Sequence, residues 1–434
     1  MKIRQKIRKR RNMSQETAKE LIAFIEKSPT SFHAVKTMGD MLDGEGYIKL
    51  EEKDRWQLVP GGRYYTTRNG SALIAFSLPK GELTGFRIIA SHSDSPSFKI
   101  KENPEILVEN QYVKLNTEGY GGMLCAPWMD RPLSVAGRIA IKEEGKIVTR
   151  LVNIDRDLVM IPNLAIHMNR EANNGYKYNP QKDLLPLFGE ASAKGKFQKI
   201  LAEAAGVKEE EILGHDLFLY NRQKGTIWGA QEEFVSIGRL DDLQCAFASL
   251  KGFLAGEKEK YGAVHCVMDN EEVGSGTKQG AASTFLYDVL LRIQKGLGGD
   301  YEDYLRCVAD SFMISADNAH GVHPNYTEKA DPVNRPYLNK GIVIKHSANQ
   351  KYCTDGYSAA VFKDICRQAG VPFQTFTNRS DMPGGSTLGN ISMAQVSVNA
   401  VDIGLPQLAM HSPYETAGVE DTDYFIKAAA VFFE

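Results

Sequence analysis

Histidine and acidic residues recur in this chain directly after stretches whose composition favours β-strand. Most of them follow such a stretch, and one acidic pair instead opens a predicted helix. They are His92 and Asp94 after 86–91, Asp269, Glu271 and Glu272 after 263–268, Asp317 after 312–316, His411 shortly beyond 395–409, and Asp241 with Asp242 at the start of 240–255. Ligands of an open α/β sheet bind outside the carboxyl ends of its strands, so these side chains are expected to meet at one edge.

The donor types favour a site for divalent metal ions. Imidazole and carboxylate groups without cysteine suit Zn²⁺, Mn²⁺ or Co²⁺. Three of the groups would hold one ion, whereas five or six invite a second ion about 3.5–4 Å away, bridged by a carboxylate. A metal pair activates water and polarises a carbonyl group, and a carboxylate that is not a ligand must then accept the proton of the water. Glu271 and Glu272 are adjacent, so one can bind metal while the other acts as base, and the pattern predicts a metal-dependent hydrolase.

Each segment alone has an ordinary structural explanation. A His-x-Asp pair is more often hydrogen-bonded in the core or at the surface, and a Glu-Glu step is more often solvated. Asp241 and Asp242 could simply cap the helix that they precede. The repeated placement after strands is what favours the functional interpretation.

Strands and helices alternate in the two outer parts of the chain. We expect strands at 72–78, 86–91, 263–268, 311–316, 341–345, 373–377 and 395–403, and helices within 14–47, with Ser14 as N-cap, and at 240–255, 278–295, 355–369 and 420–432. This order predicts an α/β fold with a mostly parallel sheet and helices on both faces. Residues 97–235 instead alternate polar and apolar side chains, with helix confined to about 189–206, which is typical of antiparallel strands. We therefore expect a discontinuous catalytic domain, residues 1–96 and 236–434, and an inserted β-rich domain, residues 97–235.

Composition excludes several classes of function. The chain has 434 residues, which suggests two domains, and a net charge of −2, which provides no global attraction for nucleic acid or an anionic membrane. The basic run within residues 2–11 is expected to be a solvated start to the first helix. No apolar run reaches the roughly 18 residues of a membrane span, and no secretory signal is evident. Six scattered cysteines without paired spacing predict reduced thiols and a cytoplasmic location.

Eight short segments then occur in a characteristic order. They are A-S-H-S-D-S-P (90–96), D-R with L-S-V-A-G-R (130–138), I-P-N-L-A-I-H (161–167), G-R-L-D (238–241), D-N-E-E-V-G-S (269–275), S-A-D through His320 to H-P-N-Y (315–326), G-G-S-T (384–387) and L-A-M-H-S (408–412). In this order the chain resembles the M18 family of metallo-aminopeptidases, of the aspartyl aminopeptidase type, over nearly its whole length. The resemblance implies a phosphorylase/hydrolase-like zinc-peptidase core and removal of single residues from peptide N-termini.

The resemblance also implies a role for each site residue. Asp241 would bridge two divalent ions, most simply Zn²⁺, with Mn²⁺ or Co²⁺ as alternatives. His92 and Asp317 would complete one site, and Glu272 with His411 the other. Glu271 would be the general base, and Asp94 would orient the ring of His92.

Further implications concern substrate and assembly. The inserted domain would build dimers that assemble into a tetrahedral homododecamer, where His167 would reach the active site of a neighbouring subunit. Lys345 and Tyr352 would line the pocket for the first side chain of the peptide. Lys345 could pair with an N-terminal Asp or Glu, or it could be a strand-end lysine facing solvent, in which case neutral residues such as Leu would be preferred.

The chain departs from the family pattern at three places. Asp242 stands where Asn is common, Pro132 replaces a usual Asp, and the segment 331–334 lacks histidines that aspartyl-specific members carry. None of these changes removes an expected ligand or the base.

Three other interpretations compete with this one. The related tetrahedral family of glutamyl and deblocking aminopeptidases shares the His-x-Asp and Glu-Glu-Val-Gly elements, and a metal amidohydrolase acting on acylated amino acids would share the core. The long insertion between His92 and Asp241 disfavours both. A non-catalytic metal-binding scaffold of the same fold is disfavoured by the retention of Glu271.

Overall fold

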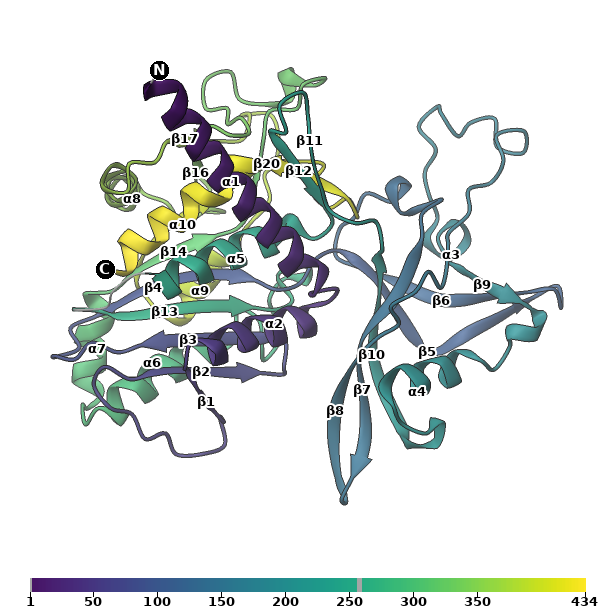
Figure 1. Cartoon of the computed structure of the whole chain (residues 1–434), viewed down its shortest axis with the longest axis horizontal. Helices are drawn as coiled ribbons and strands as arrows, with labels where there is room; N and C mark the ends of the chain where they lie inside the picture. The colour runs from purple at the N-terminus through teal and green to yellow at the C-terminus, as the bar shows by residue number, and fades with distance from the viewer. Residues whose placement is uncertain (1, 256–259) are drawn as a thin grey trace. The chain divides into compact units, whose positions relative to one another are not determined.

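The computed structural model describes residues 2–255 and 260–434, with side chains from residue 12 onward (Figure 1). The chain divides into two compact units. Unit 1 contains Met1–Asp94, Gly225–Met410 and Glu415–Glu434, and unit 2 contains Ser95–Lys224 with His411–Tyr414. Each unit has its own sheet and its own hydrophobic core.

A nine-stranded mixed sheet forms the centre of unit 1. In spatial order its strands are β1 (Ile48–Leu50), β2 (Arg63–Arg68), β3 (Ala72–Ser77), β13 (Gly262–Met268), β4 (Phe86–His92), β14 (Phe312–Ala316), β18 (Asn399–Gly404), β16 (Ile342–Lys345) and β17 (Phe373–Phe376). The central pairs β13–β4, β4–β14 and β14–β18 are parallel, as are β1–β2 and β16–β17. The pairs β2–β3, β3–β13 and β16–β18 are antiparallel.

Helices cover both faces of this sheet. Side chains alternate along a strand, so Leu73 and Ala75 of β3 enter one core while Ile74 and Phe76 enter another. The first core also contains residues of α1 (Lys2–Glu26), α2 (Ser31–Gly44), α5 (Leu240–Ala255), α8 (Gly356–Gln368) and α10 (Val419–Phe433). The second contains residues of α6 (Phe285–Gly296), α7 (Tyr301–Ala309) and α9 (Leu388–Gln395). The predicted α/β class, with helices on both faces of the sheet, is confirmed.

A second, five-stranded sheet also belongs to unit 1. Its order is β11 (Thr226–Trp228), β12 (Phe234–Ile237), β20 (Glu415–Gly418), β19 (Pro406–Leu408) and β15 (Ala319–His320). From the sequence, residues 226–235 are expected in the inserted domain. In the structure β11 pairs with β12, and β12 pairs with β20 of this sheet. Short 3₁₀ turns, η4 (Glu271–Val273) and η5 (Thr327–Lys329), complete the unit.

Unit 2 is built on a six-stranded antiparallel sheet. Its order is β8 (Lys146–Asn153), β7 (Leu133–Glu143), β10 (Ile212–Asn221), β5 (Ser97–Val108), β6 (Tyr112–Tyr120) and β9 (Leu187–Glu190). The helix α4 (Phe197–Ala205) packs in the same core as β7 and β10. The remaining elements are α3 (Pro180–Asp183) and the turns η1 (Ala126–Trp128), η2 (Ala191–Ala193) and η3 (Glu209–Glu211).

Several predicted boundaries are corrected. The helix expected from Ser14 already begins at Lys2, so Ser14 is a buried residue inside α1 rather than its N-cap. The backbone of the basic run is part of α1, and its side chains lie outside the described residues. All six cysteines are free and five are buried. Among the residues that the structure describes, no helix combines the length and apolar character needed to cross a bilayer.

Candidate metal centre

Parallel strand pairing brings the first two sequence clusters together. His92 is the last residue of β4, and the β13–β4 register places it beside Met268, the last residue of β13. The backbone N–H of Ser93 donates to the carbonyl oxygen of Met268 (2.8 Å), which holds the two strand ends side by side. Asp94 and Asp269 therefore emerge at the same edge of the sheet, as expected for the carboxyl ends of parallel strands.

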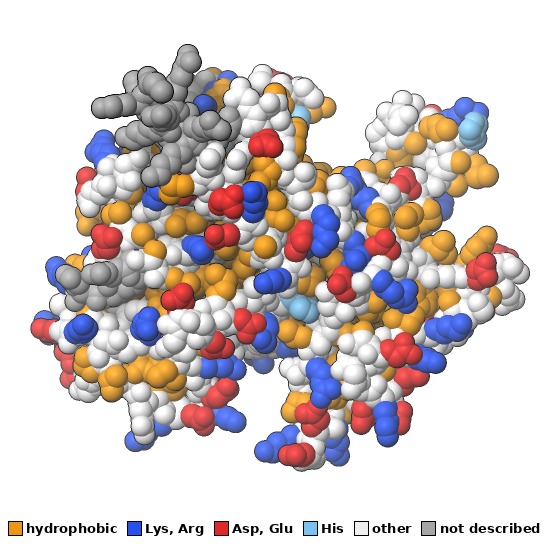
Figure 2. Space-filling model, in the orientation of Figure 1, with side chains coloured by type: hydrophobic (Ala, Val, Ile, Leu, Met, Phe, Trp, Pro, Cys, Tyr) orange, Lys and Arg blue, Asp and Glu red, His pale blue; other side chains and the backbone are white. Residues whose placement is uncertain are grey.

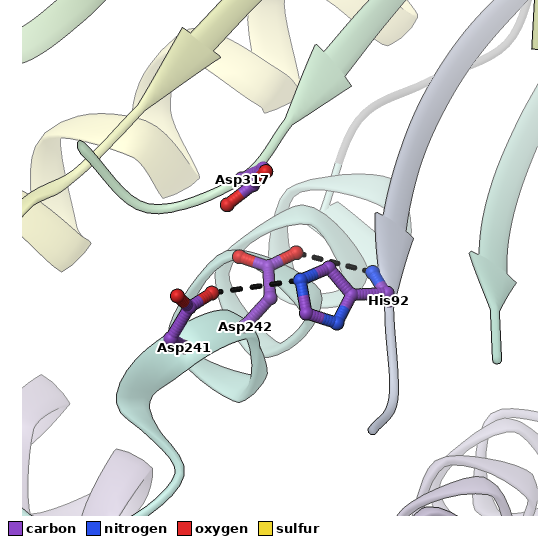
Figure 3. Close-up of side chains that lie close together, drawn as sticks. All are labelled: His92, Asp241, Asp242 and Asp317. Atoms are coloured by element: carbon purple, nitrogen blue, oxygen red, sulfur yellow. Dashed lines mark hydrogen bonds and ion pairs between the residues drawn. The ribbon is translucent and has the colours of Figure 1, made fainter. Parts of the chain in front are cut away.

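One imidazole and three carboxylates converge at this edge (Figure 3). The group consists of His92, Asp241, Asp242 and Asp317, all buried, with one ligand atom from each within 4.8 Å of the others. Nε2 of His92 lies 3.5 Å from Oδ1 of Asp241. The backbone N–H of His92 donates to Oδ2 of Asp242 (3.1 Å). Asp317 follows β14, which is the neighbour of β4.

The two aspartates of the α5 segment precede its regular helical part. Asp241 and Asp242 have non-helical backbone angles (φ −80°, ψ 108° and φ −117°, ψ 20°) and are joined by a cis peptide bond. The N–H of Asp241 donates to Oε2 of buried Glu415 in β20 (3.1 Å). Negative charge at a helix N-terminus is favoured by the helix dipole. Glu415, which the sequence did not single out, therefore helps to position Asp241.

Asp94 clamps the segment that carries the glutamates. After β13 the chain turns at Asn270, whose φ of 61° is left-handed, into η4. The backbone N–H groups of Glu271 and Glu272 donate to the two carboxylate oxygens of Asp94 (3.1 and 3.2 Å). Nδ1 of His92 lies 3.1 Å from the backbone carbonyl oxygen of Asp94 and 3.3 Å from its Oδ1. One buried residue thus orients the ring of His92 through its backbone and carboxylate and the Glu271–Glu272 segment through its carboxylate, and a ligand atom from each of these three residues lies within 4.8 Å of the others.

Crowding of buried carboxylates perturbs their acidity. Burial raises the pKa of Asp317 to about 6, opposed by Lys345 and assisted by Asp241. Burial also raises the pKa of Glu271 to about 8, again with a contribution from the charge of Asp317. The pKa values of Glu272 and Asp242 are raised by the same two causes, burial and neighbouring carboxylates. A divalent cation among these groups would relieve their repulsion, and the imidazole–carboxylate donor set fits Zn²⁺, Mn²⁺ or Co²⁺.

Lys345 is buried, contrary to the alternative of a lysine facing solvent. Its ammonium donates to the carbonyl oxygen of Asn318 (2.9 Å) and lies 3.8 Å from Oδ2 of Asp317. It also lies 5.4 Å from the ring centre of buried Tyr352. Lys345 therefore places a positive charge next to an expected metal ligand.

Two residues expected at the site belong to unit 2. His411, at φ 67°, donates from Nδ1 to the carbonyl oxygen of Gly122, which leaves Nε2 as the nitrogen suited to a metal. His167 is exposed in the segment between β8 and α3. Both histidines thus belong to the unit that contains the antiparallel sheet.

Comparison with known proteins decides the family. A family model described as aminopeptidase I zinc metalloprotease (M18) matches residues 24–433. The chain belongs to the M18 family. A Clostridium acetobutylicum protein named "Probable M18 family aminopeptidase 2" is 48% identical over 426 residues, covering 96% of this chain and 98% of that protein. The expected family is thereby confirmed.

Solved structures agree with this assignment. The M18 chain superposes with a TM-score of 0.94 on a structure described as the Ape4 and Nbr1 complex, at 34% identity, covering 98% of this chain and 86% of that one. A structure described as the S. cerevesiae mApe1 dodecamer matches with a TM-score of 0.86 at 29% identity, covering 96% of each chain. The chain is thus a metallo-aminopeptidase by family, and its buried His/Asp group fits the zinc metalloprotease description.

Proposed function

We propose that this M18 protein removes single residues from the N-termini of peptides, using two divalent metal ions and Glu271 as general base. The observation that carries the proposal is the buried group of His92, Asp241, Asp242 and Asp317, with Glu271 and Glu272 held beside it by Asp94. Ligands, base and orienting carboxylate come from separate segments and share one sheet edge.

The ligands divide between two ions. His92, Asp241 and Asp317 would hold one ion, because their donor atoms already lie together. Asp241 would also bind the second ion, with Glu272 and, as the family resemblance implies, His411. Zn²⁺ is the proposed metal, and Mn²⁺ or Co²⁺ would be accepted by the same donors.

Glu271 is the carboxylate available for proton transfer. Bound metal ions would lower the pKa of water and polarise the scissile carbonyl. Glu271 would take a proton as the water oxygen bonds to the carbonyl carbon, and would return it to the nitrogen when the C–N bond breaks. In the metal-free protein burial raises the pKa of Glu271, and bound cations beside it would lower that pKa again and favour the ionised form that accepts a proton.

The first side chain of the peptide would lie near Lys345 and Tyr352. Once Asp317 is engaged by metal, the ammonium of Lys345 would favour an N-terminal Asp or Glu. If Lys345 instead stays committed to Asp317 and Asn318, neutral residues such as Leu would be preferred. The ratio of kcat/KM for Asp or Glu to that for Leu distinguishes these two preferences.

Unit 2 would serve self-association. The proposed inserted domain, residues 97–235, carries exposed apolar residues beside His167: Leu164, Ile166 and Met168. Figure 2 shows hydrophobic side chains on this projecting segment. Exposed apolar patches mark interaction surfaces. A homododecamer, the state named for the S. cerevesiae relative, would allow His167 to reach a neighbouring active site.

A paired-substrate assay tests the proposed activity. Metal-free protein, alone and after addition of Zn²⁺, Mn²⁺ or Co²⁺, would be incubated with Leu-Ala-Ala and Glu-Ala-Ala and with their N-acetylated counterparts. We expect metal-dependent release of the first residue from the free peptides and none from the acetylated ones. Cleavage of the acetylated peptides, or no cleavage with any metal, would refute the proposal.

A further inference from the structure

A fully buried carboxylate outside the metal group connects two loops at the same sheet edge. Asp402 lies on β18, where the parallel register places it beside Ser315 of β14, two residues before Asp317. The loops that follow β16 and β17 pass close to Asp402, although they lie far from it in the sequence. The first loop, 346–355, carries Tyr352, and the second, 377–387, ends with the G-G-S-T segment.

The contacts of Asp402 reach both loops. Oδ2 accepts the backbone N–H of Cys353 (2.5 Å), and Oδ1 accepts the hydroxyl of Thr387 (2.8 Å). The backbone N–H of Asp402 donates to Oγ1 of Thr354 (2.9 Å). Ser386 Oγ lies 3.5 Å from the carbonyl oxygen of Lys351, a longer contact between the two loops themselves. Asp402 is therefore hydrogen-bonded to both loops.

Neighbouring residues are adapted to this carboxylate. A Cβ on Gly389 would lie 2.7 Å from Oδ1 of Asp402 and 2.8 Å from the hydroxyl of Ser315, so glycine leaves the space that the carboxylate occupies. Thr387 is the N-cap residue of α9, but its side chain makes no capping hydrogen bond. Threonine usually caps its own helix, whereas this hydroxyl is directed to Asp402.

The hydrogen bond between Cys353 and Asp402 lies next to Tyr352 in the chain. Tyr352 packs with Phe376 (ring centres 6.2 Å apart) and lies near the ammonium of Lys345. The bond from Cys353 to Asp402 fixes the backbone directly after Tyr352, and the two bonds to Thr354 and Thr387 fix the surrounding chain. The bonds from Cys353 and Thr387 reach the carboxylate of Asp402, whereas Thr354 bonds to the backbone of Asp402. Hydrogen bonds to a carboxylate are among the stronger ones in proteins.

We infer that Asp402 is a positioning residue, which holds the loop of Tyr352 and the Gly384–Thr387 segment as the wall of the pocket for the first side chain of the peptide. The inference rests on the proposed function, because it assigns a wall to that function's substrate pocket. Asp402 itself would touch neither substrate nor metal.

Removal of single hydroxyl groups tests the inference in the metal-loaded, full-length protein. Thr387→Val deletes the contact of its hydroxyl with the carboxylate of Asp402, and Thr354→Val deletes two contacts with the backbone of Asp402 (2.9 and 3.4 Å). Both changes keep the side-chain shape. For p-nitroanilides of Leu and Glu we expect KM to rise roughly five- to tenfold relative to that of Ala, whose side chain barely contacts the wall. We expect kcat to stay within about twofold of the wild-type value and the bound metal to be unchanged.

Two controls separate positioning from general stability. Thr387→Ser keeps the hydroxyl and is expected to restore the wild-type ratio of KM values. Ser311→Ala removes a buried hydroxyl that bonds to the backbones of Phe86 (2.8 Å) and Cys307 (2.6 Å) at the opposite end of β14 from Asp317, and it is expected to leave the ratio unchanged.

An unchanged KM ratio in folded Thr387→Val and Thr354→Val, or the same change in Ser311→Ala, would overturn the inference. Failure of both Asp402-contact variants to fold would overturn it as well, because the bonds would then support the whole fold. If the wild-type protein releases no residue from any peptide, the proposed function itself is refuted. A wild-type protein that is active, with variants whose ratio does not move, refutes only the role of Asp402.

Discussion

Asp94→Asn is the substitution that best separates the orienting carboxylate from the ligands. Asp94 accepts the N–H groups of Glu271 and Glu272 on separate oxygens and faces Nδ1 of His92. Asparagine keeps the shape but replaces one acceptor oxygen by an NH₂ group, which then faces a donor. The negative charge beside the ring of His92 is lost as well.

The expected magnitude follows from the lost contact. A hydrogen bond to a charged group contributes about 1.5–3 kcal/mol. If this energy holds the ligands in place, metal affinity should fall by roughly 10–100-fold, which is also the usual effect of losing a carboxylate that orients a metal-binding histidine. The turnover at saturating metal should fall too, because Glu271 would no longer be fixed.

The assay is a chelator-competition titration with Zn²⁺ at constant pH, followed by kcat at saturating metal. Asp421→Asn is the matched control, because buried Asp421 also accepts two backbone N–H groups, those of Asn339 (2.6 Å) and Gly341 (3.0 Å). We expect the control to lower the melting temperature without changing metal affinity. Equal losses of affinity in both variants, or an Asp94→Asn affinity within about twofold of wild type, would refute the reasoning.

The remaining predictions concern the base, the buried lysine and pH. Glu271→Gln should retain both ions while kcat falls by about 10²–10⁴-fold. Glu272→Gln should instead lower the affinity for one of the two ions. Loss of metal from Glu271→Gln would show that Glu271 is a ligand and not the base. Lys345→Met should destabilise the metal-free protein at pH 8 by about 3–5 kcal/mol in urea unfolding, because buried Asp317 loses its cation; an unchanged midpoint would show that the 3.8 Å contact is not stabilising. Burial raises the folded-state pKa values of Asp317, Asp269 and Glu271 to about 6, 7 and 8. These carboxyl groups bind more protons in the folded metal-free protein than in the unfolded chain, whereas buried His33 and His265, with pKa values lowered to about 4 and 3, bind fewer below about pH 6.5. Above that pH the raised carboxyl pKa values decide the sign, so stability should fall as pH rises from about 7 to 8.5. Urea midpoints at these two pH values measure this, and a midpoint that rises with pH would contradict it.

The parts of the fold that were predicted correctly have strong local signals. The runs 86–91 (F-R-I-I-A-S) and 263–268 (A-V-H-C-V-M) are mostly apolar, and polar residues follow each of them directly. They form β4 and β13 almost to the residue, because strands covered on both faces need no polar positions. The candidate site residues of unit 1 that the structure brings together were singled out for the same reason, since they directly follow such strands or begin α5.

Other elements lacked a local signal. The helix expected at 278–295 begins only at Phe285, because the residues before it form turns, in which the N–H of Gly280 donates to the carbonyl oxygen of Thr277 (3.1 Å) and the N–H of Ser283 to that of Gly280 (3.0 Å). Helix α9 was missed, and its sequence L-G-N-I-S-M-A-Q shows why: the pattern is hardly amphipathic, and tertiary contacts decide its structure. The strand expected at 395–403 begins at Asn399. Within the predicted helix 189–206, residues 189 and 190 end strand β9 and only 197–205 are α-helix.

Some contacts around the buried His/Asp group could not be predicted from the spacing of residues in the sequence. Asp242 was expected at the same sheet edge but received no role of its own, yet its carboxylate belongs to the buried group and accepts the backbone N–H of His92. Glu415 contacts the backbone of Asp241 across 174 residues of sequence, and no local pattern indicates that contact. Such partners depend on how the strands pair, which a single sequence does not specify.

The most direct test of the central claim is to titrate metal-free protein with Zn²⁺ while measuring bound metal and the release of leucine from Leu-Ala-Ala in the same samples. The proposed mechanism predicts that activity approaches its maximum only as the second equivalent binds. It also predicts that Glu271→Gln binds the same two equivalents with almost no release. Full activity at one bound equivalent, or an active Glu271→Gln protein, would contradict a two-metal site with Glu271 as its base.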